Sequence, residues 1–415
     1  MVDSIPLRIC LLSYRSHPHC GGQGVYIKNL SKALKDLGHR VEVVSGPPTP
    51  HLDDGIPLFR IPSLDLYNPD NLFRTPSLKE LSDPINLIEW LGVSTMGFPE
   101  PFTFGLRAYK FLIKKIHKYD IVHDNQSLSH GLRAIQRKVP TITTIHHPIT
   151  VDRNLAIRDA SSFWQKIKQM RWYSFVGMQK KVSRTFSHII TVSRSARNDI
   201  SYDFKIPVNR FRVIPNGINT NLFYPIPEIA KKKNRIIVTN SSDTPLKGLH
   251  YLLRAVSEMS KTRKVSLVVV GTPKKNGNIR KLVKDLDIGE LVTFTGRIDN
   301  DEYVQQYAKA SVAVVPSVYE GFGLPAGEAM ACGLPVVSTT GGALPEVIGN
   351  AGILVPSADF RALNKAITTI LDNPVLARKM GDTGYQRVQK RFTWKRAAEK
   401  TVEVYREVIG DYSRF

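Results

Sequence analysis

Residues 317–328 read SVYEGFGLPAGE, and the fold and function expected of the chain follow from this stretch. The apolar run before it, Val312–Val315, is typical of a buried parallel strand, whereas Leu324–Ala331 predicts a helix with Pro325 in its first turn. A turn that joins such a strand to such a helix leaves backbone N–H groups at the helix start without partners, and an anion can accept their hydrogen bonds. The segment therefore predicts a ligand-binding turn. The alternative is an ordinary α/β loop with two solvated glutamates.

Two carboxylates, Glu320 and Glu328, lie eight positions apart in this segment. The glycines between them have no Cβ, so a ligand can approach the backbone of the turn closely. Carboxylates beside a phosphate-binding helix start suit a ligand that carries both hydroxyl and phosphate groups, which predicts a nucleotide sugar. Besides the two glutamates, the contacts expected from the turn come from Gly321, Phe322, Gly323 and Leu324.

The same segment resembles the E-x7-E signature of the retaining glycosyltransferases of family 4, also called glycosyl transferase group 1, which have the GT-B fold. Four further segments follow in the order found in that family: GGQG at residues 21–24, VIPNGIN at 213–219, KG at 247–248 and RFTW at 391–394. Together they extend the resemblance over nearly the whole chain.

The resemblance implies an α/β protein with the GT-B fold, in which two Rossmann-like parallel-sheet domains face each other across a cleft. A C-terminal helix is expected to cross back and pack on the first domain. The expected parts are an acceptor-side domain over 1–214, a nucleotide-sugar-binding domain over 215–392 and the helix over 393–415. The implied activity is a hexosyltransferase reaction from a UDP- or GDP-sugar to an acceptor, with retention of anomeric configuration and without a metal or other cofactor.

Length and pattern agree with two domains. A chain of 415 residues is long enough for two separate cores. Strand-like runs alternate with helical patterns in both halves, as in parallel sheets covered by helices. These runs are Arg8–Ser13, Arg40–Ser45, Ile121–His123, Thr141–Ile145 and His188–Val192, then Ile236–Thr239, Ser266–Val270, Val292–Thr295, Val312–Val315, Val336–Ser338 and Ile353–Val355. From Pro47 to Thr103 Pro is frequent and periodicity poor, which predicts an insertion of loops and short helices.

Composition predicts a cytoplasmic protein. No run approaches the roughly 20 apolar residues of a membrane span. The start of the chain is acidic and Arg8 interrupts its apolar run, so it is interpreted as a first strand and not as a signal peptide. The three cysteines, Cys10, Cys20 and Cys332, lack metal-ligand spacing and fit a reducing compartment.

Positive charge is concentrated in the second quarter of the chain. Residues 101–210 contain 20 Lys and Arg against 6 Asp and Glu, within a net charge of +22 for the whole chain. Aromatic and basic residues interleave over Phe163–Tyr173, which suits the inner face of an anionic membrane and a lipid-linked or phosphorylated acceptor. The alternative is a helix that packs on the core with its cations in water. No zinc-finger, basic-zipper or RNA-recognition signature accompanies the charge, so nucleic acid is not expected as a partner.

The N-terminal glycine loop follows the first predicted strand. Exposed N–H groups near Gly22 and Gly24 are expected to hold the diphosphate or the acceptor, and the alternative is a tight turn without a ligand. The loop is not a dinucleotide fingerprint, because Ile27 occupies the place of the third glycine and the next strand ends in Ser45-Gly46 instead of an acid.

Lys247 follows a predicted strand and can neutralise the diphosphate as its bond to the sugar breaks. In the family an Arg five or six positions earlier shares this task, but Ser241 and Ser242 occupy those places here. Either Ser242 and the backbone assist Lys247, or another arginine replaces the missing one, and Arg297 is the candidate. This departure is also the best support for a rival function, a protein that binds nucleotide sugars without turnover.

The resemblance implies two further roles. His123 is predicted to lie at the carboxyl end of a strand. The matching His of the family reaches the hydroxymethyl region of the donor sugar from that position. Glu328 is expected to accept hydrogen bonds from both ribose hydroxyls. No carboxylate nucleophile is evident, so attack on the face of the departing phosphate is the preferred mechanism, with His123, Glu320 and Lys247 as catalytic residues. An epimerase of the same fold is a second rival. The acidic pair Asp285 and Asp287 is interpreted as surface charge and not as a metal site.

Overall fold

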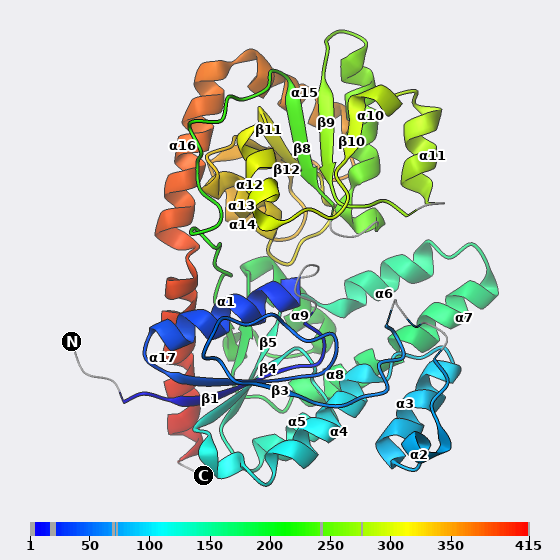
Figure 1. Cartoon of the computed structure of the whole chain (residues 1–415), viewed down its shortest axis with the longest axis vertical. Coiled ribbons are helices and arrows are strands. Elements are labelled where there is room, and N and C mark those ends of the chain that lie inside the picture. Colours follow the sequence, from blue (N-terminus) through cyan, green and yellow to red (C-terminus); the bar gives the residue numbers. More distant parts are fainter. Residues whose placement is uncertain are drawn as a thin grey trace. The chain divides into compact units, whose positions relative to one another are not determined.

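The computed structural model describes residues 5–16, 22–68, 71, 74–240, 244–274 and 277–413 (Figure 1). The chain divides into two compact units. Unit 1 comprises residues 1–192, 196–214 and 397–415, and unit 2 comprises 193–195 and 215–396.

Unit 1 is built on a parallel sheet of seven strands in the order β3-β2-β1-β4-β5-β6-β7. The strands are β1 (Arg8–Ser13), β2 (Arg40–Ser45), β3 (Leu58–Arg60), β4 (Ile121–Asn125), β5 (Thr141–Ile145), β6 (Ile189–Thr191) and β7 (Phe211–Val213). All but β3 and β7 were predicted as strands. These two have only three residues each and are defined by their pairing with β2 and β6, which periodicity cannot detect.

Helices cover both faces of this sheet. They are α1 (Gly22–Asp36), α2 (Leu78–Leu81), α3 (Pro84–Ser94), α4 (Glu100–Leu112), α5 (His130–Gln136), α6 (Ile149–Arg158), α7 (Phe163–Trp172), α8 (Val176–Ser183) and α9 (Arg194–Phe204). Alternate residues of β1 take opposite sides, as a strand requires. Cys10 and Leu12 share a core with Phe104 and Ala108 of α4.

The segment between Pro47 and Thr103 has the loops and short helices that were predicted. Two of its helices begin with good N-caps: the Ser77 side chain accepts from the N–H of Glu80 before α2, and Asp83 accepts from that of Ile85 before α3. The short strand β3 attaches the segment to the edge of the sheet.

Unit 2 is built on a second parallel sheet, in the order β10-β9-β8-β11-β12-β13. Its strands are β8 (Arg235–Thr239), β9 (Ser266–Val270), β10 (Val292–Phe294), β11 (Val312–Val315), β12 (Val336–Thr339) and β13 (Gly352–Val355). Its helices are α10 (Leu249–Ser260), α11 (Asn278–Asp285), α12 (Asn300–Ala308), α13 (Leu324–Ala331), α14 (Leu344–Ile348), α15 (Phe360–Asp372) and α16 (Pro374–Arg391). The predicted strands match these within one residue at each end. Two Rossmann-like parallel-sheet domains are thus confirmed.

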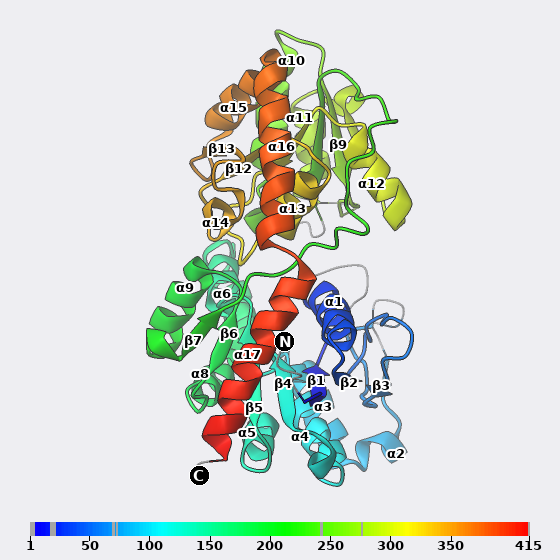
Figure 2. The ribbon, with the colours of Figure 1, turned by 90° about the vertical axis from the view of Figure 1, so that its left-hand side faces the viewer.

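The C-terminal helix α17 (Trp394–Tyr412) belongs to unit 1 from Ala397 onward, as predicted (Figure 2). Tyr405 is fully buried, and its hydroxyl lies 2.6 Å from Nδ1 of His123 on β4. Farther along the helix, Glu407 accepts a hydrogen bond from Nε of Arg212 at 3.0 Å. Helix α17 therefore packs on unit 1 through Tyr405 and Glu407.

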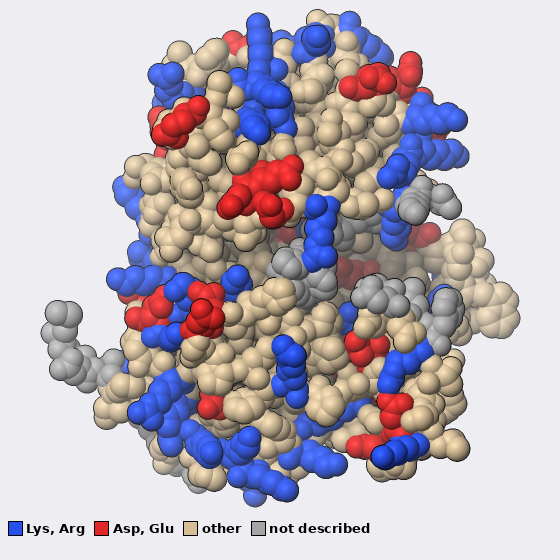
Figure 3. Space-filling model, in the orientation of Figure 1, with Lys and Arg blue, Asp and Glu red and all other residues tan. Residues whose placement is uncertain are grey.

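Charge is mixed on the face drawn in Figure 3, where Lys and Arg side chains interleave with Asp and Glu. Among the described helices, none combines the length and apolar character that a bilayer span needs.

Replacing Tyr405 by Phe tests the place of α17 in unit 1. Phe fills the same volume but removes the hydroxyl, which leaves a buried nitrogen of His123 without its partner. We expect a loss of about 1–3 kcal/mol in the free energy of unfolding, measured by urea denaturation followed by circular dichroism. Tyr412→Phe, at a 38% exposed side chain, is the control and should change little. Equal stability of the two variants would show that the buried hydrogen bond contributes nothing.

Candidate functional site

The sheet of unit 2 reverses its strand order between β8 and β11. From β8 the chain continues outward through β9 and β10, whereas β11, β12 and β13 extend to the other side. Loops that leave the carboxyl ends of such neighbouring strands diverge, and ligands of open α/β sheets bind in the crevice between them. Lys247 lies in the loop after β8 and Glu320 in the loop after β11.

These two predicted residues contact each other. Nζ of Lys247 donates to Oε1 of Glu320 at 2.8 Å, and Oγ of Ser317 donates to the same oxygen at 2.8 Å. The Lys247 side chain is 26% exposed and that of Glu320 is 12% exposed. The cation is therefore fixed at the switch point of the sheet while remaining accessible to solvent.

The two loops pack backbone against backbone. Leu246 accepts a hydrogen bond at its carbonyl from the N–H of Val318 at 2.8 Å. Gly248 is left-handed, with φ of 66°, and a Cβ built there would lie 2.0 Å from the carbonyl oxygen of Pro316. Only glycine fits this position, because both its conformation and the space around it exclude a side chain. This explains why a glycine follows Lys247.

The glycine turn leads directly into α13. Gly323, with φ of 97°, precedes the helix, whose first residues are Leu324 and Pro325. Phe322 is buried with its ring centroid 5.7 Å from that of Phe392. Within the described residues the N–H groups of Gly323 and Leu324 have no acceptor. The turn thus presents backbone donors at the positive end of a helix.

The loop after β12, which contains Gly341 and Gly342, packs against the glycine turn. The N–H of Ala343 donates to the carbonyl of Glu320 at 2.9 Å, and the hydroxyl of Thr339 donates to the carbonyl of Ser317. Gly342 is left-handed, with φ of 61°, and a Cβ there would lie 2.2 Å from the Glu320 oxygen. Sequence reasoning missed this loop, although the Gly341-Gly342 pair, which begins three residues after the end of a predicted strand, was a usable signal.

Glu328 lies on α13 within a network of tyrosines. The hydroxyl of Tyr303 on α12 donates to Oε2 of Glu328 at 3.0 Å and lies 2.9 Å from Oγ1 of Thr239, at the end of β8. Tyr307, one turn later, lies 3.1 Å from the Tyr303 hydroxyl. Burial raises the pKa of the Glu328 carboxyl to about 7. Sequence reasoning missed both tyrosines, whose only signal is their i,i+4 spacing on a helix.

His123 occupies a different place from the one predicted. Strand β4 continues two residues beyond it, so the side chain points to a face of the sheet instead of emerging at the carboxyl end. It is 1% exposed, with its ring nitrogens bonded to Tyr405 and to Oγ1 of Thr144 at 2.7 Å. Burial lowers its pKa to about 3. A neutral core histidine with both nitrogens bonded does not support the predicted contact with a sugar.

Other side chains lie at the carboxyl edge of unit 1. The order of its sheet reverses between β1 and β4, and Nδ2 of Asn125 donates to Oγ of Ser13 across that point at 3.2 Å. His146, which follows β5, places Nε2 2.7 Å from Oδ1 of Asn125. Of the predicted glycines, Gly22 is the exposed first residue of α1 and Gly24 is buried. The rest of the loop, residues 17–21, lies outside the described residues.

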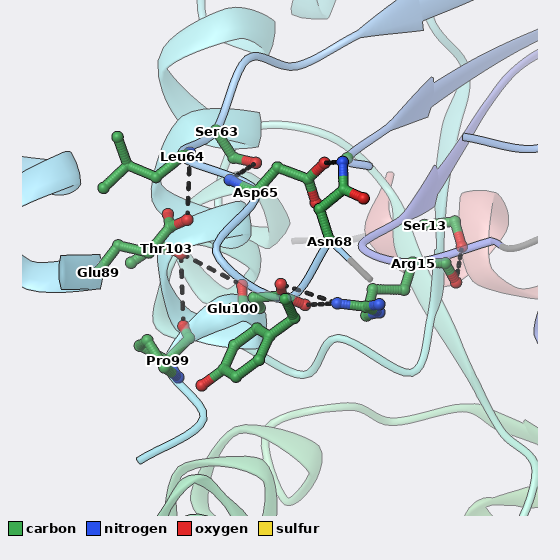
Figure 4. Close-up of polar contacts among 12 residues, drawn as sticks. Ser13, Arg15, Ser63, Leu64, Asp65, Asn68, Glu89, Pro99, Glu100 and Thr103 are labelled. Atoms are coloured by element: carbon green, nitrogen blue, oxygen red, sulfur yellow. Dashed lines mark hydrogen bonds and ion pairs between the residues drawn. The ribbon is translucent and has the colours of Figure 1, made fainter. Parts of the chain in front are cut away.

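A cluster of buried and partly buried charged side chains lies beside this edge (Figure 4). Nη1 of Arg15, just after β1, donates to both carboxylate oxygens of Glu100 at 2.9 and 2.8 Å. Burial raises the pKa of Glu100 to about 7. Deeper in, Arg107 pairs with Glu89, which is 1% exposed and also accepts from the N–H of Leu64 at 3.3 Å. The Arg15–Glu100 pair therefore attaches the end of the insertion to the segment after β1, and the Arg107–Glu89 pair attaches α3 to α4.

Comparison with known proteins agrees with this architecture. Residues 20–222 match the family described as Glycosyltransferase Family 4, and residues 225–387 match Glycosyl transferases group 1. The chain is 44% identical to an MMP alpha-(1->4)-mannosyltransferase of Mycolicibacterium hassiacum over 97% of its own length and 99% of the relative's. The chain belongs to the group 1, family 4 glycosyltransferases. Its resemblance to that family, inferred from the E-x7-E segment, is thereby confirmed.

Solved structures share the GT-B fold. A sucrose-phosphate synthase of Thermosynechococcus elongatus matches with a TM-score of 0.76 and 24% identity, covering 97% of this chain and 100% of that one. Anabaena Alr3699/HepE in complex with UDP and glucose matches with a TM-score of 0.71 and 18% identity, over 97% and 100% of the two chains.

Two predicted donor contacts of this glycosyltransferase stay predictions. Arg297 follows β10 and is exposed, without an ion pair to any described residue. Strand β9 separates β10 from β8, so the two strand ends lie roughly 10 Å apart, given about 4.8 Å between neighbours. Ser242 lies outside the described residues. The predicted pair Asp285 and Asp287 is exposed at the end of α11.

Gly248→Ala tests the packing of the two loops in this glycosyltransferase. We expect it to lose roughly 3 kcal/mol or more in unfolding free energy, because conformational strain adds to a backbone clash. Two matched variants separate these terms in urea denaturation. Gly38→Ala introduces positive-φ strain without a neighbour within 4 Å and should lose about 1 kcal/mol. Gly289→Ala introduces neither and should change little. Equal losses for Gly248→Ala and Gly38→Ala would mean that the loops do not constrain each other.

Proposed function

We propose that this glycosyltransferase transfers a mannosyl group from a nucleoside-diphosphate mannose to a hydroxyl of an acceptor, with retention of anomeric configuration. The observation that carries the proposal is the Lys247–Glu320 pair at the switch point of the unit 2 sheet, beside the N–H groups of Gly323 and Leu324, which have no acceptor in the part of the chain that the structure describes. A cation and a helix start in one place suit a diphosphate leaving group.

The proposal assigns the following roles to residues of unit 2. Lys247 neutralises the diphosphate as its bond to the anomeric carbon breaks, and the N–H groups of Gly323 and Leu324 bind the sugar ring or the phosphate oxygens. Glu328 accepts hydrogen bonds from the ribose hydroxyls in its deprotonated form. Arg297 and Ser242 are the proposed additional phosphate contacts. The positive groups take the part that a divalent cation has in other transferases, so no metal is proposed.

The same contacts argue against a covalent glycosyl-enzyme intermediate on Glu320. Its Oε1 already accepts from Lys247 and from Ser317, both at 2.8 Å. Such a carboxylate positions a cation and is a weak nucleophile. We therefore propose that the acceptor oxygen attacks the anomeric carbon on the face that the diphosphate leaves. The acceptor proton moves to the departing phosphate oxygen, and the new bond keeps the configuration of the old one.

The mannosyl group is proposed from the 44% identical relative, which is named an alpha-(1->4)-mannosyltransferase. That name also favours a sugar hydroxyl as the acceptor, while the basic region of unit 1 keeps a lipid-linked or phosphorylated acceptor as a further prediction. The complexes of Alr3699/HepE with UDP and glucose support a nucleotide-sugar donor. Either UDP or GDP fits the contacts described.

The test is a donor and product assay on the full chain. GDP-mannose, UDP-mannose, GDP-glucose and UDP-glucose, each α-linked, are incubated with soluble α-mannosides, and the product is analysed by nuclear magnetic resonance. We expect transfer from a mannose donor and an α-linked product. A β-linked product would contradict retention, and turnover of glucose donors alone would contradict mannosyl transfer. Donor binding without turnover on any acceptor would favour the alternative function, a protein that binds nucleotide sugars without catalysing transfer.

Lys247→Met tests the role of the cation in the same assay. Removing one preorganised group that stabilises the leaving charge typically lowers kcat by about 10²–10³-fold, and we expect a loss of this size. Lys261→Met is the matched control, because Lys261 also donates to a glutamate, Glu258, at 2.8 Å but on the surface. The idea fails if both variants retain wild-type kcat.

The raised pKa of Glu328 predicts that donor binding depends on pH. Its pKa of about 7 means that the carboxylate needed for the ribose hydroxyls forms only as the pH rises through 7. We expect donor affinity, measured by isothermal titration, to increase about tenfold from pH 6 to pH 8. Without donor, the free energy of unfolding changes with pH in the opposite direction. A carboxyl whose pKa is raised in the folded state contributes stability below about pH 4.5, and this contribution is lost as the pH rises through 7. Glu328→Gln should bind weakly at both pH values, and an unchanged slope would place the titrating group elsewhere.

A further inference from the structure

We propose that helix α7 forms a docking surface for anionic lipid, through Phe163, Trp164 and Met170 together with Lys166 and Lys168. This set of five residues is called the α7 surface below. The proposal goes beyond sugar transfer, and it concerns where the enzyme resides and not what it catalyses.

The apolar part of the α7 surface is unusually exposed. Phe163 is 71%, Trp164 76% and Met170 61% exposed, and none of the ten residues of α7 is buried. The two rings contact each other, with centroids 6.1 Å apart, instead of packing into the core. A helix in a soluble domain normally buries one face, so this one has an apolar side available to a partner.

The charges of α7 are all of one sign. Lys166, Lys168 and Arg171 are exposed, and the helix contains no Asp or Glu. With 3.6 residues per turn, Lys166 lies one turn after Phe163 and Lys168 one turn after Trp164, so each exposed ring has a cation beside it on the helix surface. This is the pattern of an interfacial helix, whose rings enter the headgroup region while its cations contact lipid phosphates.

The C-terminal end of α7 anchors it to unit 1. The ring of Trp172 stacks on Phe98 at 5.1 Å, and Nη2 of Arg171 donates to Oγ1 of Thr95 at 2.7 Å. Figure 1 shows α6 and α7 as a helical pair that extends outward from the rest of unit 1. The contacts at the C-terminal end of α7 therefore fix the helix while its N-terminal half remains exposed to solvent.

The neighbouring helix α3 also exposes apolar side chains. Its residues Leu87, Ile88 and Leu91 are 40–49% exposed, and Met96 just beyond it is 50% exposed. Thr95, which Arg171 contacts, links this group to the end of α7. A bilayer can accommodate two such groups without the shape complementarity that a protein partner requires.

Charge complementarity decides in favour of lipid. A second copy of this chain would bring the cations of α7 against the same cations, within molecules that each carry a net charge of +22. A neutral glycan would use the rings but would gain little from the lysines. An anionic bilayer uses both at once.

The test is sedimentation of the full chain with vesicles of phosphatidylcholine alone and with 30% phosphatidylglycerol, at low and high salt. We expect binding to the anionic vesicles only, weakened by salt, and a blue shift of fluorescence that is absent in a Trp164→Ser variant. The double variants Phe163→Ser with Trp164→Ser and Lys166→Glu with Lys168→Glu should each bind at least tenfold more weakly. Val375→Ser with Lys379→Glu removes an 80% exposed apolar residue and a nearby cation of unit 2 and should bind like the wild type.

Several outcomes would overturn the proposal. These are no sedimentation with anionic vesicles, equal binding to neutral vesicles, or equal loss in the control variant. A change in oligomeric state in the Phe163–Trp164 variant, or a fluorescence shift with oligosaccharides in place of vesicles, would assign the α7 surface to another occupant. Donor titration of the same variants should remain unchanged, which separates this result from the proposed function.

Discussion

The contact between the loops after β8 and β11 is the constraint on which the organisation of unit 2 depends. The strands are neighbours, and a hydrogen bond from Val318 to Leu246 and the missing side chain of Gly248 bring the loops into direct backbone contact. This approach brings Nζ of Lys247 within 2.8 Å of Glu320, although 73 residues separate them in sequence. The glycine after the lysine thus permits the close approach that places Lys247 beside Glu320.

Unit 1 depends on a comparable long-range contact, but one that is structural. His123 on β4 and Tyr405 on α17 are 282 residues apart and meet in the core. A neutral histidine there can satisfy both ring nitrogens, with Tyr405 on one side and Thr144 on the other. Residue type and strand position suggested a site role, yet the extension of β4 to Asn125 turned the side chain into the core.

The fold was largely predictable from the sequence, and the site only in part. Apolar runs such as Val312–Val315 report burial directly, so the strands of unit 2 were placed within a residue. Glu320, Glu328 and Lys247 could be predicted as site residues because their motifs are local. Tyr303 and the Gly341-Gly342 pair were missed, because their roles arise from packing between elements that are distant in sequence. Likewise, nothing local in the sequence reveals that Glu100 pairs with Arg15.

The charges of the candidate site explain how carboxylates can belong to the proposed phosphate-binding site. Taken alone, Glu320 and Glu328 would repel a diphosphate. Lys247 offsets the charge of Glu320, and burial, by raising its pKa to about 7, leaves Glu328 partly protonated near neutral pH. The N–H groups at the start of α13 and the dipole of that helix then add to the positive charge of Lys247 in attracting an anion. In the proposed function the acids orient the cation and bind hydroxyls, while Lys247 and the backbone bind phosphate, so the spacing of the two glutamates around a glycine turn suits one ligand.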